Sequence, residues 1–349
     1  MPGAGPVPAR ALPQLLAGYA GPPEALDPLL GMPLLVVDLE GAGTVDLAPL
    51  RSRPACVVIG IHRAAEPLPD VPAELVDVLL CPVTGPPAPW VGVPDVDAAV
   101  ATVAAAVRAA PQAATALVQL LRLAERLAPA DAVVAESFAY ATLQAGAEHR
   151  AWLAGRTPRR RRGSGGPAVL VERRGETLLL TLNRPEVRNA YDATVRDGLA
   201  EGFRLALADD GLRHIELHGS GPDFCAGGDL TEFGTTPDPV TAHLVRTTAG
   251  AAPPLLAVAD RVTVHLHGNC IGAGIEVPAF AARVLAAPDT VLRLPEIGMG
   301  LIPGAGGTVS ITRRIGRHRT GWLALTGQPL PALQARDWGL VDEVRPVPG

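Results

Sequence analysis

The spacing of apolar residues predicts that the second half of the chain alternates strands with helices. Short apolar runs bounded by turn residues are typical of buried strands, and apolar residues three and four apart are typical of amphipathic helices. We expect strands at 168–172, 177–182, 214–217, 262–266, 284–285 and 291–292, and helices at 192–208, 239–249, 276–282, 310–315 and 317–325. This order predicts an α/β fold.

The first half of the chain is predicted to hold a few strands followed by helices. Three apolar runs favour strands at 34–39, 56–61 and 75–81. Valines then recur at spacings of four, three and four from Val96 to Val107, so a helix is expected to begin near Asp95. Two further helices are expected at 113–127 and 131–153, with Asp131 as the N-cap of the second.

An arginine- and glycine-rich segment separates the two halves. It includes four consecutive arginines at 159–162, which is typical of a solvated linker; contact with phosphate or RNA is the alternative. The pattern divides the chain into an N-terminal region at 1–155, a linker at 156–167 and a second domain at 168–349.

Composition favours a globular protein with a sizeable core. The 349 residues are 48% apolar, and no apolar run approaches the length of about 18 residues that a membrane span needs. Residues 1–6 lack the charged head and apolar body of a signal peptide, and the four cysteines have no metal or redox spacing. We therefore expect a cytoplasmic location and no membrane partner. A net charge of −5 argues against a nucleic-acid partner.

The chain contains no lysine, because all 30 basic residues are arginine. Schiff-base catalysis and a Walker-type phosphate loop both need a lysine amine, so both are excluded. Any phosphate is expected to be held by arginine or by backbone N–H groups. The sequence implies neither a metal nor a redox cofactor.

Three glycine-rich segments and two glutamates point to one site. Small residues at 224–230, 267–276 and 300–308 let a ligand approach the backbone and leave N–H groups for an anion. Glu276 ends the second segment, and Glu296 lies shortly before the third. Backbone donors can hold a developing oxyanion while carboxylates move protons.

These segments, in this order, resemble the crotonase (enoyl-CoA hydratase/isomerase) superfamily. The matching motifs are Leu182-Asn183-Arg184-Pro185 with Asn189-Ala190, the Phe224 to Leu230 turn, the loop ending in Glu276, Pro295-Glu296, the Ile302 to Thr308 run, and Leu325-Thr326-Gly327 through Asp342. The resemblance covers roughly residues 168–345. It implies a ββα spiral, normally assembled as trimers or pairs of trimers.

The resemblance also implies roles for individual residues. The N–H groups of Gly228 and Ala273 would form the oxyanion hole for a thioester carbonyl, with Ala273 in place of the more usual glycine. Glu276 and Glu296 align with the two glutamates of the hydratases. The residues expected to line the bound substrate are Ala226, Gly227, Asp229, Gly272, Gly274, Pro303 and Gly304.

Several of these residues also have simpler explanations. Glu276 could be a helix-terminal charge, Glu296 a turn residue, and the glycines of 304–307 a requirement of backbone geometry. Asp229 could orient its loop, and Cys225 and Cys270 are expected to be small packing residues. His265 and His267 alternate at a strand end, so one of them is expected to face the core.

The N-terminal region departs from the family pattern. Helices that the family carries after the strand at 339–344 are expected to be replaced by the helices at 111–117 and 139–146, which look like them. The strands at 33–39 and 55–61 look like the family's opening strands. We hypothesise that residues 1–155 are a degenerate crotonase half whose helices cover the site, in the same chain or a neighbouring one.

The expected activity is hydration of a 2-enoyl thioester or dehydration of a 3-hydroxyacyl thioester. The acyl carrier would be coenzyme A or a carrier-protein arm, and no cofactor beyond the coenzyme A of the substrate is implied. Arg184 and Arg188 are candidates for its phosphates. The alternatives are another enolate reaction (isomerisation, hydrolysis, decarboxylation or cofactor-free dioxygenation) and a non-catalytic acyl-CoA-binding partner.

Overall fold

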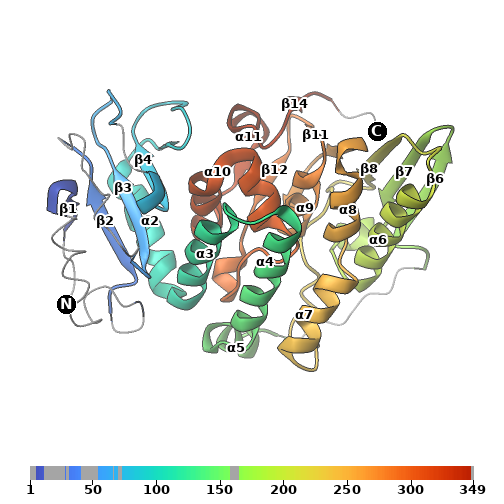
Figure 1. Cartoon of the computed structure of the whole chain (residues 1–349), viewed down its shortest axis with the longest axis horizontal. Coiled ribbons are helices and arrows are strands. Elements are labelled where there is room, and N and C mark those ends of the chain that lie inside the picture. The colour runs from blue at the N-terminus through green and yellow to red at the C-terminus, as the bar shows by residue number, and fades with distance from the viewer. Residues whose placement is uncertain are drawn as a thin grey trace.

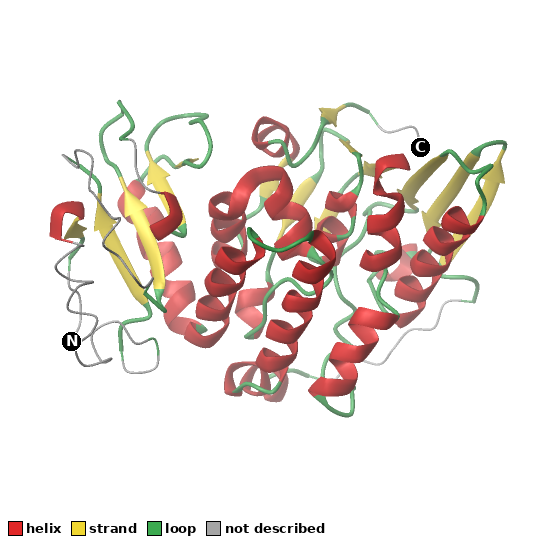
Figure 2. Ribbon diagram, in the orientation of Figure 1, coloured by secondary structure: helices red, strands yellow, loops and turns green. Residues whose placement is uncertain are grey.

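The computed structural model describes residues 5–11, 28, 31–40, 54–65, 67–69, 73–157 and 165–346. Within these residues the strands form three sheets. One large sheet lies at each end of an elongated molecule, and helices occupy the space between them (Figures 1 and 2). The α/β class expected from the sequence is confirmed. The arginine run at 159–162 lies outside the described residues.

The N-terminal sheet has five parallel strands in chain order. They are β1 (Val7–Pro8), β2 (Leu34–Asp38), β3 (Val57–Ile61), β4 (Val78–Cys81) and β5 (Val91–Gly92). The three strands expected from apolar runs are confirmed as β2, β3 and β4. Every residue of β3 and β4 is buried, which explains their continuous apolar sequence.

Four helices follow this sheet. They are α2 (Val96–Ala109), α3 (Pro111–Ala124), α4 (Pro129–Gln144) and α5 (Ala147–Ala154). The Asp95 side chain accepts from the Ala98 N–H at 2.9 Å, so the expected start of α2 is confirmed. The valine spacing is explained by burial of Val96, Val103 and Val107.

The second half contains a mixed six-stranded sheet, in the order β14-β11-β9-β8-β7-β6, and a small three-stranded sheet, β10-β12-β13. The bounds are β6 (Val169–Arg174), β7 (Thr177–Leu182), β8 (His214–Gly219), β9 (Val262–Leu266), β10 (Asn269–Ile271), β11 (Arg283–Ala286), β12 (Val291–Arg293), β13 (Leu330–Pro331) and β14 (Glu343–Val344). The β6–β7 hairpin is antiparallel, and the other pairs of the large sheet are parallel.

The helices of this half are α6 (Ala193–Ala208), α7 (Pro239–Thr248), α8 (Ala252–Val258), α9 (Ala273–Glu276), α10 (Gly307–Thr326) and α11 (Ala332–Trp338), with short 3-10 turns η7 (Pro278–Phe280) and η8 (Glu296–Met299) near the site. Gly316 interrupts α10 with a φ of +77°, as expected from two helices meeting there.

The N-terminal helices pack against the second half of the same chain. Helix α4 lies beside α7, and α3 lies beside α10 (Figure 1). One hydrophobic cluster includes Val103 and Leu117 from the first half and Leu323 and Leu325 from α10. The described parts of the two halves therefore share a core.

Buried arginines after the break at Gly316 also link the halves. The Arg317 guanidinium donates to the Val76 carbonyl at 2.7 Å, and Arg319 donates to the Pro86 carbonyl at 2.8 Å. Asp77, which lies 3.5 Å from Arg317, also pairs with Arg122 of α3. These contacts attach α10 to the N-terminal sheet.

Three helix predictions were wrong in detail. Helix α4 begins at Pro129 after Ala128, so Asp131 lies in the first turn and is not the N-cap. The expected helix at 131–153 is divided at Gly146, whose N–H donates to the Leu143 carbonyl at 2.8 Å and closes a tight turn. The expected helix at 276–282 begins earlier, at Ala273, because the turn at Gly272 starts it and Pro278 cannot continue its hydrogen bonding.

Among the described helices, none is by itself long and apolar enough to cross a membrane; α2 and α3 pass that test only as a pair bent by 110°.

Candidate active site

Two glycine-rich turns meet beyond the carboxyl ends of β8 and β9. Cys225, after β8, forms a bridge with Cys270 on β10, and the Ile271 N–H donates to the Cys225 carbonyl at 3.0 Å. A Cβ on Gly274 would collide with that carbonyl. Glycine at 274 therefore lets the two turns come together.

The N–H groups of Gly228 and Ala273 donate to no acceptor in the described part of the chain. Gly228 forms a bridge with Tyr191. That bridge uses the N–H groups of Tyr191 and Asp229, at 2.8 and 2.9 Å, and not the N–H of Gly228. Ala273 is the first residue of α9, where an N–H has no acceptor within the helix. Both donors are therefore available to a ligand oxygen.

Gly272 sets the direction of the second turn. Its φ of +51° strongly favours glycine. Its N–H donates to the Arg293 carbonyl at 2.9 Å, and its own carbonyl accepts from Ile275 and Glu276 at 2.8 and 2.9 Å. The turn thus places Ala273 at the start of α9 and the Glu276 carboxyl one helical turn later.

The Glu276 carboxyl is buried and held by the loop that precedes α10. Its Oε2 atom accepts from the N–H groups of Ala305 and Gly307 at 2.7 and 3.0 Å. The side chain is 2% exposed. The glycine-rich run at 304–307 therefore holds a carboxylate through its main chain.

The Glu296 carboxyl approaches the same point from η8. A Cβ on Gly272 would lie 2.5 Å from Glu296 Oε1 and 3.7 Å from Glu276 Oε1. The Oε2 atom of Glu296 is enclosed and has no hydrogen-bond partner among the described residues. The structure therefore brings together the two glutamates that the sequence analysis singled out, with one oxygen of Glu296 free to bond a ligand.

Burial raises the pKa of both carboxyls. The pKa of Glu276 lies well above its ordinary value, first because of burial and then because Glu296 and Glu136 are nearby. Burial raises the pKa of Glu296 to about 8, and Glu136 adds to that shift. A carboxyl with a pKa of about 8, such as that of Glu296, can both accept and donate a proton near physiological pH.

A third carboxyl, which the sequence analysis missed, comes from the N-terminal region. Glu136 on α4 is 2% exposed. It accepts from the Gly306 N–H at 2.7 Å and from the N–H and hydroxyl of Thr308 at 2.9 and 2.7 Å. Burial raises its pKa to about 7. Glu136 therefore holds the loop whose N–H groups hold Glu276. The signal for Glu136 in the sequence was its position within an apolar helical stretch.

Tyr140, one turn after Glu136, completes this contact. Its ring packs against the backbone of Gly304, where any Cβ would collide with it. The Arg246 guanidinium of α7 lies 4.6 Å from the centre of the Tyr140 ring and donates to the Ser137 hydroxyl at 3.1 Å. Helix α4 therefore covers the site within the same chain.

The Asn189 side chain connects the Asn183-Arg184-Pro185 motif to the first glycine turn. The buried Asn189 side chain donates to the carbonyls of Ser220 and Asp223 at 2.8 and 3.0 Å, and accepts from the Arg184 N–H at 2.8 Å. The Asp223 carboxylate in turn accepts from the Asn269 N–H at 2.9 Å. These bonds connect the segment after β7 to both glycine turns.

The remaining predicted residues lie in the same loops. The Ala226 N–H donates to the Arg188 carbonyl at 2.9 Å, Gly227 has a φ of +92°, and Pro303 is buried. Asp229 accepts from the N–H and hydroxyl of Thr231 at 2.8 and 2.7 Å, so it orients its loop.

The cysteines beside the site are packing residues, as expected. Cys225 and Cys270 are buried, and burial raises the pKa of Cys225 to about 12, so its thiol stays protonated.

The two arginines that were candidates to bind the coenzyme A phosphates differ in exposure. Arg184 is buried and pairs with Asp192, so it is not placed to meet a phosphate from solvent. Arg188 is 67% exposed and lies 3.6 Å from Asp223, so of these two candidates only Arg188 remains.

This fold and site define a class of α/β proteins in which two buried carboxyls converge next to a backbone N–H donor at the start of a helix. A family model described as enoyl-CoA hydratase/isomerase matches residues 172–348. The chain belongs to this family, and with it to the crotonase superfamily.

Individual relatives match about half of the chain. The 2,3-dehydroadipyl-CoA hydratase of Escherichia coli K12 is 33% identical over 178 residues, which cover 51% of this chain and 69% of the relative. The mevalonyl-coenzyme A hydratase of Beauveria bassiana is 32% identical over 49% of this chain and 64% of its own length. A crystal structure of an enoyl-CoA hydratase from Thermoplasma volcanium matches with 34% identity and a TM-score of 0.47, over 52% of this chain and 72% of that chain.

Proposed function

We propose that this protein adds water to a 2-enoyl-CoA thioester, or removes water from a 3-hydroxyacyl-CoA thioester. The observation that carries the proposal is the pair of raised-pKa carboxyls, Glu276 and Glu296, that converge above Gly272 beside two free N–H donors. The names of the relatives, hydratases of CoA thioesters, support the same substrate class.

In this proposal the N–H groups of Gly228 and Ala273 bind the thioester carbonyl oxygen. Charge builds on that oxygen when a nucleophile adds at Cβ or a proton leaves Cα, and fixed donors stabilise it without reorganisation. The donors are backbone groups held by the bridges at Cys225 and Tyr191, so their positions do not depend on side-chain rotamers.

The two glutamates divide the proton transfers. A water bound between the carboxyls loses its proton to one of them as its oxygen attacks Cβ, and the other supplies a proton to Cα. The two N–H donors on Oε2 of Glu276 offset part of the rise in its pKa that burial causes, and this favours a carboxylate that accepts a proton through Oε1. Glu296 has a pKa of about 8 and an unpartnered Oε2, which suit it to carry the second proton.

The test is incubation with a panel of enoyl-CoA and 3-hydroxyacyl-CoA thioesters in ¹⁸O-water, read by mass spectrometry. Wild type is expected to form an ¹⁸O-labelled hydroxyacyl thioester, and Glu276→Gln or Glu296→Gln is expected to lower the rate by about 10²–10⁴-fold. Glu201→Gln, at an exposed position of α6, is the matched control.

Other outcomes would replace the proposal. Label in a released acid would identify a hydrolase, and a moved double bond without label would identify an isomerase. Tight binding without turnover of any thioester would identify a non-catalytic partner. A trimeric or hexameric assembly, a cytoplasmic location and a carrier-protein alternative to coenzyme A remain predictions.

A further inference from the structure

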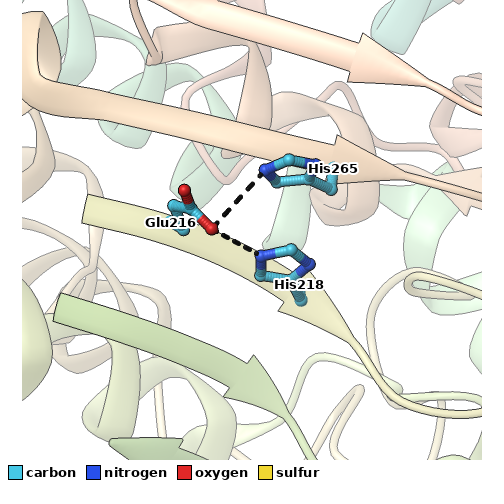
Figure 3. Close-up of side chains that lie close together, drawn as sticks. All are labelled: Glu216, His218 and His265. Carbon is cyan, nitrogen blue, oxygen red and sulfur yellow. Dashed lines mark hydrogen bonds and ion pairs between the residues drawn. The ribbon is translucent and has the colours of Figure 1, made fainter. Parts of the chain in front are cut away.

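A cluster of three potential metal ligands lies on the six-stranded sheet, on the face opposite its core. Glu216 and His218 alternate on β8, and His265 lies on the neighbouring strand β9 (Figure 3). The parallel register pairs Leu217 with Val264, so His218 and His265 fall side by side. Leu217 and Val264 point into the hydrophobic core, and the cluster therefore points away from it.

The three side chains bring their ligand atoms close together. Glu216 Oε2 lies 3.3 Å from His218 Nε2 and 3.9 Å from His265 Nε2. The two imidazole rings are stacked, with centroids 4.2 Å apart and planes inclined by 11°. One ligand atom from each residue lies within 4.8 Å of the other two. Figure 3 shows both rings directing a nitrogen toward the same carboxylate oxygen.

His265 lacks the partner that a buried imidazole requires. Its side chain is 9% exposed, and neither ring nitrogen has a hydrogen-bond partner among the described residues. A buried polar group without a partner is costly, typically about 1–3 kcal/mol. By contrast, His267, two residues later, has a ring nitrogen 3.0 Å from the Gly221 carbonyl oxygen. The nitrogen of His265 that faces Glu216 is thus placed to ligate.

We propose that Glu216, His218 and His265 bind a divalent transition-metal ion, for which Zn²⁺ is the best match. Zinc takes histidine nitrogen and carboxylate oxygen at about 2.0–2.2 Å in tetrahedral sites, which sets the ligand atoms roughly 3.3–3.5 Å apart. The distance from Glu216 to His218 already lies in this range. Closing the other distances requires Glu216 to rotate and the His218 ring to turn out of its stack with His265; these two side chains are 45% and 25% exposed.

The charges around the cluster are compatible with a cation. Arg283 and Arg345 lie near the cluster and oppose a cation, but both pair with Glu343, at 3.2 and 3.8 Å. The exposed side of the cluster leaves a fourth position for water.

The bound metal would crosslink β8 to β9. Strand β8 leads to the turn of Gly228, and β9 leads to the turn of Ala273, so the crosslink would stabilise the strands that carry both proposed oxyanion donors. Its role is structural, and binding does not depend on the activity proposed above. Sequence spacing gave no sign of it, because His265 lies 47 positions after His218 and is matched to it only by strand pairing.

The test is titration of the chelator-treated full chain with Zn²⁺ by calorimetry and with Co²⁺ by visible absorption. We expect one ion per chain, a tetrahedral Co²⁺ spectrum, and a higher melting temperature with Zn²⁺. Glu216→Gln and His218→Ala should each weaken binding by more than about tenfold, since loss of even a hydrogen-bond partner of a ligand costs roughly 10–100-fold.

His214→Ala is the matched control, because His214 lies on β8 but is exposed and outside the cluster. The His214→Ala substitution should leave the affinity for Zn²⁺ and Co²⁺ unchanged. Two results would overturn the proposal: no saturable binding of either ion, or equal affinity in wild type, Glu216→Gln and His218→Ala. Both readouts are independent of thioester turnover, so failure of the hydratase proposal leaves this test intact.

Discussion

One oxygen of Glu136 accepts from both the N–H and the hydroxyl of Thr308, at 2.9 and 2.7 Å, although the two residues are 172 positions apart. The other oxygen accepts from Gly306. Through these bonds a helix of the N-terminal region holds the loop that in turn holds Glu276. A residue outside the matched family segment therefore supports the proposed catalytic carboxyl.

Glu136→Gln is expected to impair the site from outside the family segment. The amide NH₂ would face an N–H group of Gly306 or Thr308, so at least one buried donor loses its acceptor, at a cost of roughly 1–3 kcal/mol. We expect a lower free energy of unfolding in urea and a lower kcat, measured below the melting transition. The idea is abandoned if kcat equals that of the Glu201→Gln control in a folded variant.

Gly272→Ala is expected to displace Glu296. The new Cβ would lie 2.5 Å from Glu296 Oε1, and the φ of +51° strains any side chain. A displacement of about 1 Å at a reacting group typically costs on the order of 10²-fold in rate. Steady-state kinetics should show this loss in kcat. Gly298→Ala is the control, since a Cβ there meets nothing within 4 Å; an equal effect of both substitutions would contradict the explanation.

Ala273→Pro is expected to remove one proposed oxyanion donor without ending α9. Proline is tolerated at the first position of a helix, where the N–H has no helical acceptor. Loss of one such donor typically lowers kcat by about 10²–10³-fold. Ala273→Gly keeps the N–H and should retain activity. If the proline variant folds and turns over substrate as fast as the glycine variant, the donor role is wrong.

The stability of the protein is expected to depend on the raised pKa values. An unfolded glutamate has a pKa of about 4.3, whereas the folded pKa values are about 7 for Glu136 and about 8 for Glu296. The folded state therefore binds these protons more tightly, and their stabilising contribution is complete below about pH 4 and is lost as pH rises through about 8.

Glu296→Gln should remove its share of this dependence. As pH rises from about 5 to about 9, the free energy of unfolding of the variant should increase relative to that of wild type, by an amount on the order of a few kcal/mol. Urea unfolding at several pH values measures this difference, with Glu201→Gln to correct for loss of a surface charge. A constant difference between wild type and variant across this range would mean that Glu296 is not protonated in the folded state.

Local sequence determined the elements and the approximate position of the site. Runs such as 57–61 and 262–266 are short, apolar and bounded by turn residues, so burial alone specifies strands there. Gly272 and Glu276 are four residues apart on one turn, so their relationship is local and was readable. The start of α4 at Pro129 was also a local signal that the prediction missed, because proline favours the first helical position. The ends at Gly146 and Ala273 are set by backbone turns at glycine.

Tertiary structure alone decided the relationships between distant residues. The convergence of Glu296 with Glu276, the support from Glu136 and Tyr140, and the pairing of His218 with His265 all depend on which strands and helices pack together. Burial also raises the carboxyl pKa values, and burial is a property of the packed chain. The sequence by itself determined which chemical groups are present, and packing decided which of them meet, because side-chain contacts over such separations require the whole fold.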